Sequence, residues 1–198
     1  KLYDNQVQNW IIDIINSAGF SIDRKSVSLI NEHLGNSLSK ISNEIDKLLE
    51  IKKKEKIIEL DDIEKYIGIS KEFNNFELRK ALGEKNYNKA LQITQYFSEN
   101  PNSNPIVVTI SIVFDFFNKL LLFHSNNTLN DTKIASLLGI NPFFIKEYKT
   151  ASINYDLKQV VRIISILRDY DMLSKGVGVK KADPSLLKEM VVKIINIS

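Results

Sequence analysis

Hydrophobic residues recur at helical spacing along nearly the whole chain. The clearest early runs each follow one face of a helix: Trp10, Ile11, Ile14 and Ile15, and then Leu38, Ile41, Ile45, Leu48 and Leu49. No stretch alternates between apolar and polar residues over the length that a sheet requires. The pattern therefore predicts an all-α chain without a sheet of three or more strands.

The helical pattern divides into two blocks at the stretch ISKEFNNFE, residues 69–77. In the first block, Asp23 is a plausible N-cap, and KIIELDDIEKYIG reads as a short extended stretch followed by a brief helix capped near Asp61. In the second block we expect helices at about residues 74–82, 87–99, 105–123, 131–138, 142–152, 157–174 and 184–196. Pro142 and Pro184 stand where the first turn of a helix tolerates proline. These observations predict two domains, residues 1–73 and 74–198, with a break in packing between residues 67 and 75.

Composition changes this picture little. The 198 residues are 43% hydrophobic with seven Gly, four Pro and no Cys, which suits packed helical domains and excludes disulfides and thiolate metal sites. Residues 1–73 carry 11 basic and 13 acidic side chains, whereas residues 74–198 carry 16 and 11. The second block is mildly basic but lacks the dense basic stripe of a dedicated DNA binder. The most membrane-like segment, residues 105–124, contains Asp115 and Lys119, so we expect no membrane span.

The sequence offers little chemistry for catalysis. His33 and His124 have no second histidine at metal-ligand spacing, and a structural role suits each better than a site. Asp61 and Asp62 fit a helix cap better than a Mg²⁺ pair. No phosphate-cradling G-x-x-x-x-G-K-[ST] loop occurs, and GVGVKK (residues 176–181) reads as a linker between helices. We predict no catalytic residues, no bound metal and no cofactor.

The segment IASLLGINPFFIKEY, residues 134–148, has the outline of a helix-turn-helix. Its second helix begins with Phe143 and Phe144, where a DNA-reading helix carries side chains that hydrogen-bond to base edges. We therefore expect a packing unit, with both rings mostly buried against Ile134, Leu137 and Leu138. A helix-turn-helix regulatory protein that binds DNA remains the alternative, and a small all-α enzyme has no supporting group of residues.

Three stretches together resemble a known family. They are FNNFELRKALGEKNYNKALQITQYFSENPNSNPIVVTISIVFDFFNKLLLFH, the helix-turn-helix segment, and LRDYDMLSKGVG followed by DPSLLKEMV. They resemble the C-terminal part of the delta subunit of bacterial DNA polymerase III, most closely its Bacteroidetes-type sequences. Upstream, HLGNSLSKISNEIDKLLEI is similar to the family's lid domain, with its N-E-x-x-K-L pattern at Asn43, Glu44, Lys47 and Leu48.

The resemblance implies a part of the sliding-clamp loader, a pentamer of AAA+-related subunits that acts in DNA replication in the cytoplasm. Residues 1–73 would be a helical AAA+-type lid domain and residues 74–198 a helical collar domain that joins the other loader subunits. Since the chain starts at Lys1 inside a helical pattern, we expect it to be part of a longer protein whose N-terminal domain contacts the sliding clamp. DNA contact would come through the assembled complex.

The family also sets expectations about activity and interface residues. ATP-sensing lids place an arginine near the start of the GNSLSK helix, where this chain has Leu38, so we expect neither ATP binding nor hydrolysis. Although the family belongs to a DNA-directed DNA polymerase holoenzyme, we expect no catalytic activity from this chain. A collar keeps apolar residues for its neighbours. Our candidate contact residues are Phe114, Phe117, Leu121, Tyr170 and Met190.

Overall fold

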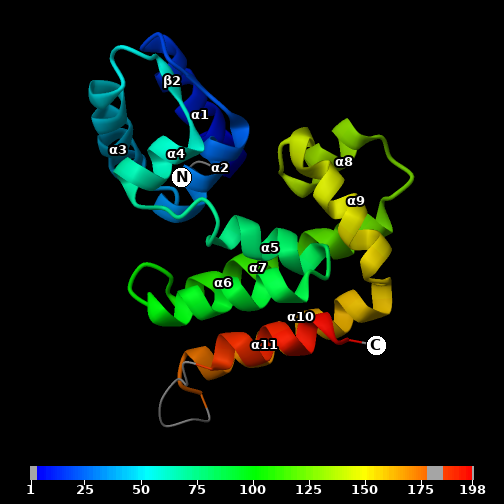
Figure 1. The fold of residues 1–198 in the computed structure, drawn as a ribbon. Helices are drawn as coiled ribbons and strands as arrows, with labels where there is room; N and C mark the ends of the chain where they lie inside the picture. The colour runs from blue at the N-terminus through cyan, green and yellow to red at the C-terminus, as the bar shows by residue number, and fades with distance from the viewer. Residues whose placement is uncertain (1–3, 178–184, 198) are drawn as a thin grey trace. The chain divides into compact units, whose positions relative to one another are not determined.

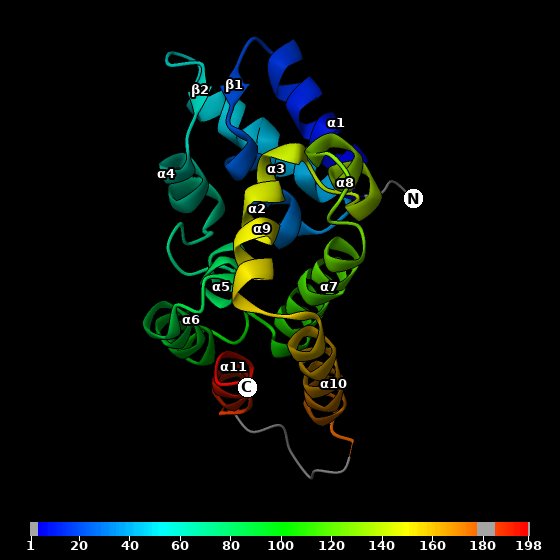
Figure 2. The same cartoon turned by 90° about the vertical axis from the view of Figure 1, so that its right-hand side faces the viewer.

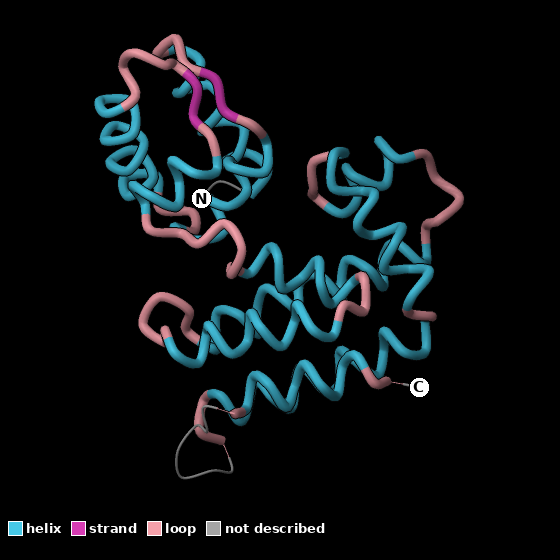
Figure 3. Tube along the Cα trace, in the orientation of Figure 1, coloured by secondary structure: helices cyan, strands magenta, loops and turns pink. Residues whose placement is uncertain are grey.

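The computed structural model describes residues 4–177 and 185–197. It is helical nearly throughout, and its only strands in those ranges are two-residue segments, which confirms the all-α prediction (Figure 3). The chain divides into two compact units, Lys1–Lys71 and Glu72–Ser198. The division falls within the predicted break and two residues before the expected boundary.

The first unit consists of helices and one minimal sheet (Figure 1). In chain order its elements are α1 (Asp4–Ser17), β1 (Ser21–Ile22), α2 (Arg24–Leu34), α3 (Leu38–Ile51), β2 (Ile57–Ile58), α4 (Leu60–Asp62) and the π-helix η1 (Ile63–Ile67). The two strands are parallel and pair Ser21 with Ile57 and Ile22 with Ile58. This pairing brings the extended stretch that the sequence predicted against the turn after α1.

Aliphatic side chains fill the core of the first unit, and Ile11, Ile41 and Ile45 are fully buried in it. Asp23 caps α2 as expected, because its carboxylate accepts hydrogen bonds from the amides of Lys25 (2.8 Å) and Ser26 (3.0 Å). Trp10 is only half-buried at the edge of this core.

The second unit is built from longer helices. They are α5 (Asn75–Gly83), α6 (Tyr87–Glu99), α7 (Ile106–Ser125), α8 (Asp131–Leu138), the 3₁₀ turn η2 (Pro142–Phe144), α9 (Ile145–Asn154), α10 (Leu157–Ser174) and α11 (Leu186–Ile195). These bounds follow the expected ranges closely, although Pro184 lies outside the described residues. Helix starts are well specified, since the side chains of Asn74, Asn86, Asn130, Asn141 and Asp156 each accept a hydrogen bond from an amide in the first turn.

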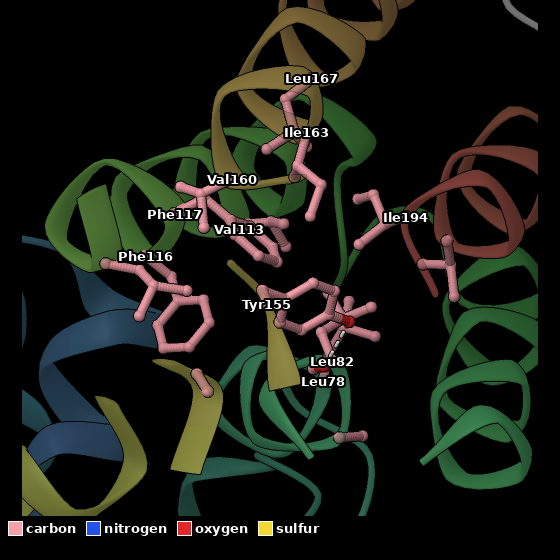
Figure 4. Close-up of a cluster of buried hydrophobic side chains, with 14 of the residues drawn as sticks. Leu78, Leu82, Val113, Phe116, Phe117, Tyr155, Val160, Ile163, Leu167 and Ile194 are labelled. Atoms are coloured by element: carbon pink, nitrogen blue, oxygen red, sulfur yellow. Dashed lines mark hydrogen bonds between the residues drawn. The ribbon is translucent and has the colours of Figure 1, made fainter. Parts of the chain in front are cut away.

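Helices α7 and α10 pack side by side and form the centre of the second unit, with α11 against α6 and α10, and α5 against α6 and α9. Side chains such as Val113, Phe117, Val160 and Ile163 fill the space between α7 and α10 (Figure 4). Figures 1 and 2 show α8 and α9 at one end of this unit, away from α6 and α11. We call α8, η2 and α9 (residues 131–154) the arm.

By length and composition alone, the 20-residue helix α7 is apolar enough to cross a membrane, which the sequence analysis did not expect. Its place in the fold accounts for that composition. One face of α7, which includes Val113, Phe117 and Leu120, is fully buried in the core. Asp115 and Lys119 form an ion pair of 2.6 Å on the outside.

Candidate functional site

Helix α7 keeps part of its apolar surface outside the core. Val107, Phe114 and Leu121 are spaced by seven residues and therefore lie near one line along the helix. Phe114 is 36% exposed, Val107 is similarly exposed, and Leu121 is half-buried. Leu122 adds a more exposed side chain beside them. We call these four residues the α7 stripe.

Helix α10 carries a second exposed row of apolar side chains. Leu157, Val161 and Met172 are each between 40% and 53% exposed. The exposed Arg168 lies between them along the same side of the helix. We call these four residues the α10 stripe. An apolar row that contains a methionine and an arginine resembles the centres of protein–protein interfaces, which are more apolar than the remaining surface and enriched in these two residue types.

Three of the five candidate contact residues are not at the surface. Phe117 and Met190 have no solvent exposure and Tyr170 has 3%, so all three belong to the domain core and cannot contact another subunit in this fold. The expectation must be corrected for them, because α7, α10 and α11 turn these positions toward one another. Of the original candidates, Phe114 and Leu121 stay accessible.

The sequence analysis also missed accessible residues, above all those of the α10 stripe. Apart from Arg168, the stripe residues of α10 are as apolar as its core residues, and only their positions around the helix separate the two sets. Val160 and Ile163 repeat with Leu167 on the buried side, whereas Leu157 and Val161 are displaced around the helix. The angular position of each residue around the helix, measured from its most apolar face, would have indicated that Leu157 and Val161 lie outside the core.

Helix α11 does not contribute such a stripe. Its apolar side chains, including Leu187, Met190 and Ile194, are buried in the core. Its outward positions include Lys188, Glu189 and Lys193, and the last two form an ion pair of 3.0 Å. The outer face of α11 is therefore charged, and Met190, the one candidate contact residue on this helix, lies in the core.

The arm consists of α8 and α9 joined by a turn at Gly139 and the 3₁₀ turn η2, and its second helix is attached to the body of the unit. Glu147 of α9 forms an ion pair with Arg79 of α5, with 3.6 Å between Nη2 and Oε2. The Arg79 guanidinium also lies over the Phe76 ring, 4.9 Å from its centre. Lys149 is paired with Asp131 of α8 at 2.7 Å. A helix whose early polar groups hold its own domain together is poorly suited to read base edges.

Only one of the two adjacent phenylalanines is buried, so the expectation holds for Phe144 and is wrong for Phe143. Phe144 is 6% exposed and meets Phe76 edge-on at 5.5 Å, whereas Phe143 is 63% exposed. The physical reason is that successive side chains in a helical turn point about 100–120° apart, so they cannot both face one core. The same geometry leaves Leu137 exposed while its neighbours Ile134 and Leu138 are buried.

Exposed residues of the arm form a mixed apolar and basic surface. Phe143, Lys146 and Ile153 are exposed along one side of the arm's second helix, and Ile153 is 85% exposed. Lys149 lies beside them. We call these four residues the arm face.

Within the described ranges, no three His, Cys, Asp or Glu side chains gather as a metal site would require. His124 has a structural contact, since its Nε2 is 2.9 Å from the carbonyl oxygen of Tyr155. Burial lowers the pKa of His33, while the charge of Glu44 acts in the opposite direction. Asp62 belongs to the capping box that starts α4, and its carboxylate accepts a hydrogen bond from the amide of Glu59 (2.9 Å). The linker proposed at residues 176–181 lies mostly outside the described residues.

The fold is similar to that of the DNA clamp loader delta protein YqeN of Bacillus subtilis, with a TM-score of 0.64. The two sequences are 20% identical, and the likeness covers 98% of this chain and 57% of that one, so this chain spans little more than half of its length. No curated protein sequence matches significantly. Residues 72–193, nearly all of the second unit, match the family described as DNA polymerase III delta subunit, C-terminal domain. Because this match covers more than half of the chain, the protein belongs to the family defined by the C-terminal domain of the DNA polymerase III delta subunit.

Proposed function

We propose that this chain supplies the helical lid and collar domains of a clamp-loader delta subunit, and that its second unit joins the other subunits of the loader. The observation that carries the proposal is the family match over residues 72–193, which coincides with a separate compact unit. On this proposal residues 1–73 are the lid domain and residues 74–198 the collar domain.

The α7 and α10 stripes are the surfaces best suited to those contacts. When a neighbouring subunit removes an apolar side chain such as Phe114 or Val161 from water, the complex is stabilised by roughly 25 cal/mol per Å² of apolar surface buried. Charged residues are depleted at the centre of protein interfaces. Arg168 is the single charged residue among the eight residues of the two stripes. The charged outer face of α11 offers no comparable surface.

Co-purification tests this proposal. The chain is mixed with the other clamp-loader subunits of the same organism, and the complex is captured at low and at high salt. Because the contact is mainly apolar, we expect it to survive salt that shortens the Debye length to about 3 Å. Val161→Lys should weaken capture strongly, since it places a charge in the α10 stripe without touching the core.

Lys188→Glu serves as the matched control, because it changes an exposed charge on the outer face of α11. It should leave capture unchanged. The chain alone should be monomeric or weakly self-associating, since a surface shaped for unlike neighbours has no reason to close with two-fold symmetry. Loss of the complex at moderate salt, or equal effects of the two substitutions, would contradict the proposal.

Contact with DNA is proposed only for the assembled loader. Lys146 and Phe143 of the arm face offer a cation for phosphate and an exposed ring for a base, which would bind without reading sequence. The helix-turn-helix alternative predicts instead a sequence-dependent gel shift by this chain alone. We expect no such shift at physiological salt.

The remaining parts of the proposal follow from the family. Gripping the sliding clamp belongs to the N-terminal domain of a full delta subunit, so a chain of these 198 residues is expected not to hold the clamp. The protein would act in the bacterial cytoplasm, where the chromosome is replicated. Clamp binding is checked by surface plasmon resonance with immobilised clamp.

A further inference from the structure

The corner between α9 and α10 consists of only two residues, Tyr155 and Asp156. Tyr155 has φ −129° and ψ 118°, an extended conformation that ends α9, and Asp156 caps the start of α10. The direction of the arm relative to α10 therefore depends on what holds this corner.

Side chains at the corner are bound to the end of α5. The Tyr155 hydroxyl donates to the carbonyl oxygen of Leu82 at 2.8 Å, a bond marked by the dashed line in Figure 4. The Asn154 amide donates to the carbonyl oxygen of Gly83, also at 2.8 Å. The last carbonyls of a helix lack their usual amide donor within it. The Leu82 carbonyl also accepts from the amide of Lys85 at 3.0 Å, so the Tyr155 hydroxyl is its second donor, and Asn154 supplies a side-chain donor to the carbonyl of Gly83.

The Tyr155 residue is held from other sides as well. Its carbonyl oxygen accepts from Nε2 of His124 at the end of α7, and its ring meets that of Phe117 edge-on at 5.5 Å. Lys85 places its ammonium 4.5 Å from the centre of the Tyr155 ring. Burial raises the pKa of Tyr155 well above its usual value, so the hydroxyl stays protonated and can donate at any physiological pH.

The end of α5 and the arm also approach closely. A Cβ atom on Gly83 would lie 3.2 Å from Cζ of Phe116 and 3.4 Å from Cβ of Ala151 in α9. Glycine at this position lets α9 pack directly on the turn whose carbonyls Asn154 and Tyr155 bind. The contacts to α5 and α7 thus converge on one short piece of chain.

We propose that Tyr155 and Asn154 are positioning residues that fix the arm relative to α10, and thereby set where the arm face lies for the DNA contact proposed for the assembled loader. The fixed direction of the arm is a claim about this chain alone. Its consequence for DNA contact rests on the proposed function above.

Hydrogen–deuterium exchange of the full chain tests the claim. Tyr155→Phe removes the hydroxyl and keeps the ring, and Tyr87→Phe is the matched control, because Tyr87 is 42% exposed at the start of α6. We expect Tyr155→Phe to speed exchange about tenfold in residues 131–154 and at the end of α5, as loss of one buried hydrogen bond implies. Exchange in α6 and α11 should stay close to that of the parent chain.

Equal acceleration in all helices would overturn the proposal, because Tyr155 would then contribute only to global stability. No acceleration in the arm would overturn it too. Asn154→Ala, which deletes the neighbouring bond, gives an independent measurement if Tyr155→Phe folds poorly, and it should show the same pattern. Capture of the other loader subunits is measured separately. Capture should stay unchanged when the arm is loosened, because the subunit contacts are proposed for the α7 and α10 stripes and not for the arm face. Weakened capture would contradict that assignment, whereas the exchange pattern alone decides the positioning claim.

Discussion

Lys56 and Lys85 have positive φ angles of 57° and 52°, a conformation in which a side chain costs about 1 kcal/mol relative to glycine. Lys56 is exposed in the turn before β2. Lys85 follows α5 and covers the Tyr155 ring. The two residues therefore share a backbone cost and differ in what their side chains contact.

Lys56→Gly should stabilise the chain by on the order of 1 kcal/mol, because it relieves the backbone without removing a packed side chain. Lys85→Gly relieves the same cost but loses a cation–π contact of roughly the same size, so its net effect should be near zero. Thermal unfolding of both variants checks this. An equal gain from Lys85→Gly would mean that its contact with Tyr155 contributes nothing.

The adjacent rings at the start of the arm's second helix give a second contrast. Phe144→Ala should lower the free energy of unfolding by about 3 kcal/mol, since it empties a site packed against Phe76. Phe143→Ala should cost less than about 1 kcal/mol, because that ring is largely in water already. Urea unfolding followed by circular dichroism separates the two. Similar losses would show that the two rings are buried to a similar extent, contrary to this prediction.

At the scale of elements, one carboxylate of the capping box at the short helix α4 also joins this helix to α3. Asp62 accepts from the Glu59 amide and also pairs with Lys52 at the end of α3, with 3.1 Å between Nζ and Oδ1. The neighbouring Asp61 is exposed and pairs with Lys71 at 2.9 Å. One aspartate thus joins two elements, whereas the other lies at the surface.

Asp62→Ala should destabilise the first unit by about 1 kcal/mol through loss of the cap alone. Asp61→Ala should change stability by less than about 0.5 kcal/mol, as is usual for exposed ion pairs. Chemical denaturation in the presence and absence of Mg²⁺ measures both effects and also tests whether this pair binds the metal. A stabilising response to Mg²⁺ that Asp61→Ala abolishes would support a metal site there.

At the scale of the whole molecule, the absence of a phosphate-cradling loop from the sequence predicts no use of ATP. Leu38, at the position where the family's ATP-sensing lids carry arginine, begins α3 and packs against the core of the first unit. Isothermal titration calorimetry should therefore detect no ATP binding in the micromolar range, and ATP hydrolysis should not exceed the buffer background. Micromolar binding abolished by a substitution in the first unit would contradict this prediction.

The sequence by itself determined the helices. Asparagine and aspartate caps, the prolines and the helical spacing of apolar residues are local signals, and most helices of the second unit begin and end within about two residues of their expected bounds. The two compact units divide between residues 71 and 72, inside the stretch 69–77 that separates the two blocks of helical spacing in the sequence. These features depend on neighbours in the chain, which a sequence records directly.

Only the tertiary structure decided which apolar residues are surplus to the core. Phe114 and Phe117 are the same residue type three positions apart on α7, yet one is partly exposed and the other is enclosed by α10 and Tyr155. The contacts of the Tyr155 corner could likewise not be predicted from the sequence, since the Tyr155 hydroxyl donates to a carbonyl oxygen 73 residues earlier in the chain. Burial and such long-range bonds are set by how helices far apart in sequence pack together, and no local pattern encodes that arrangement.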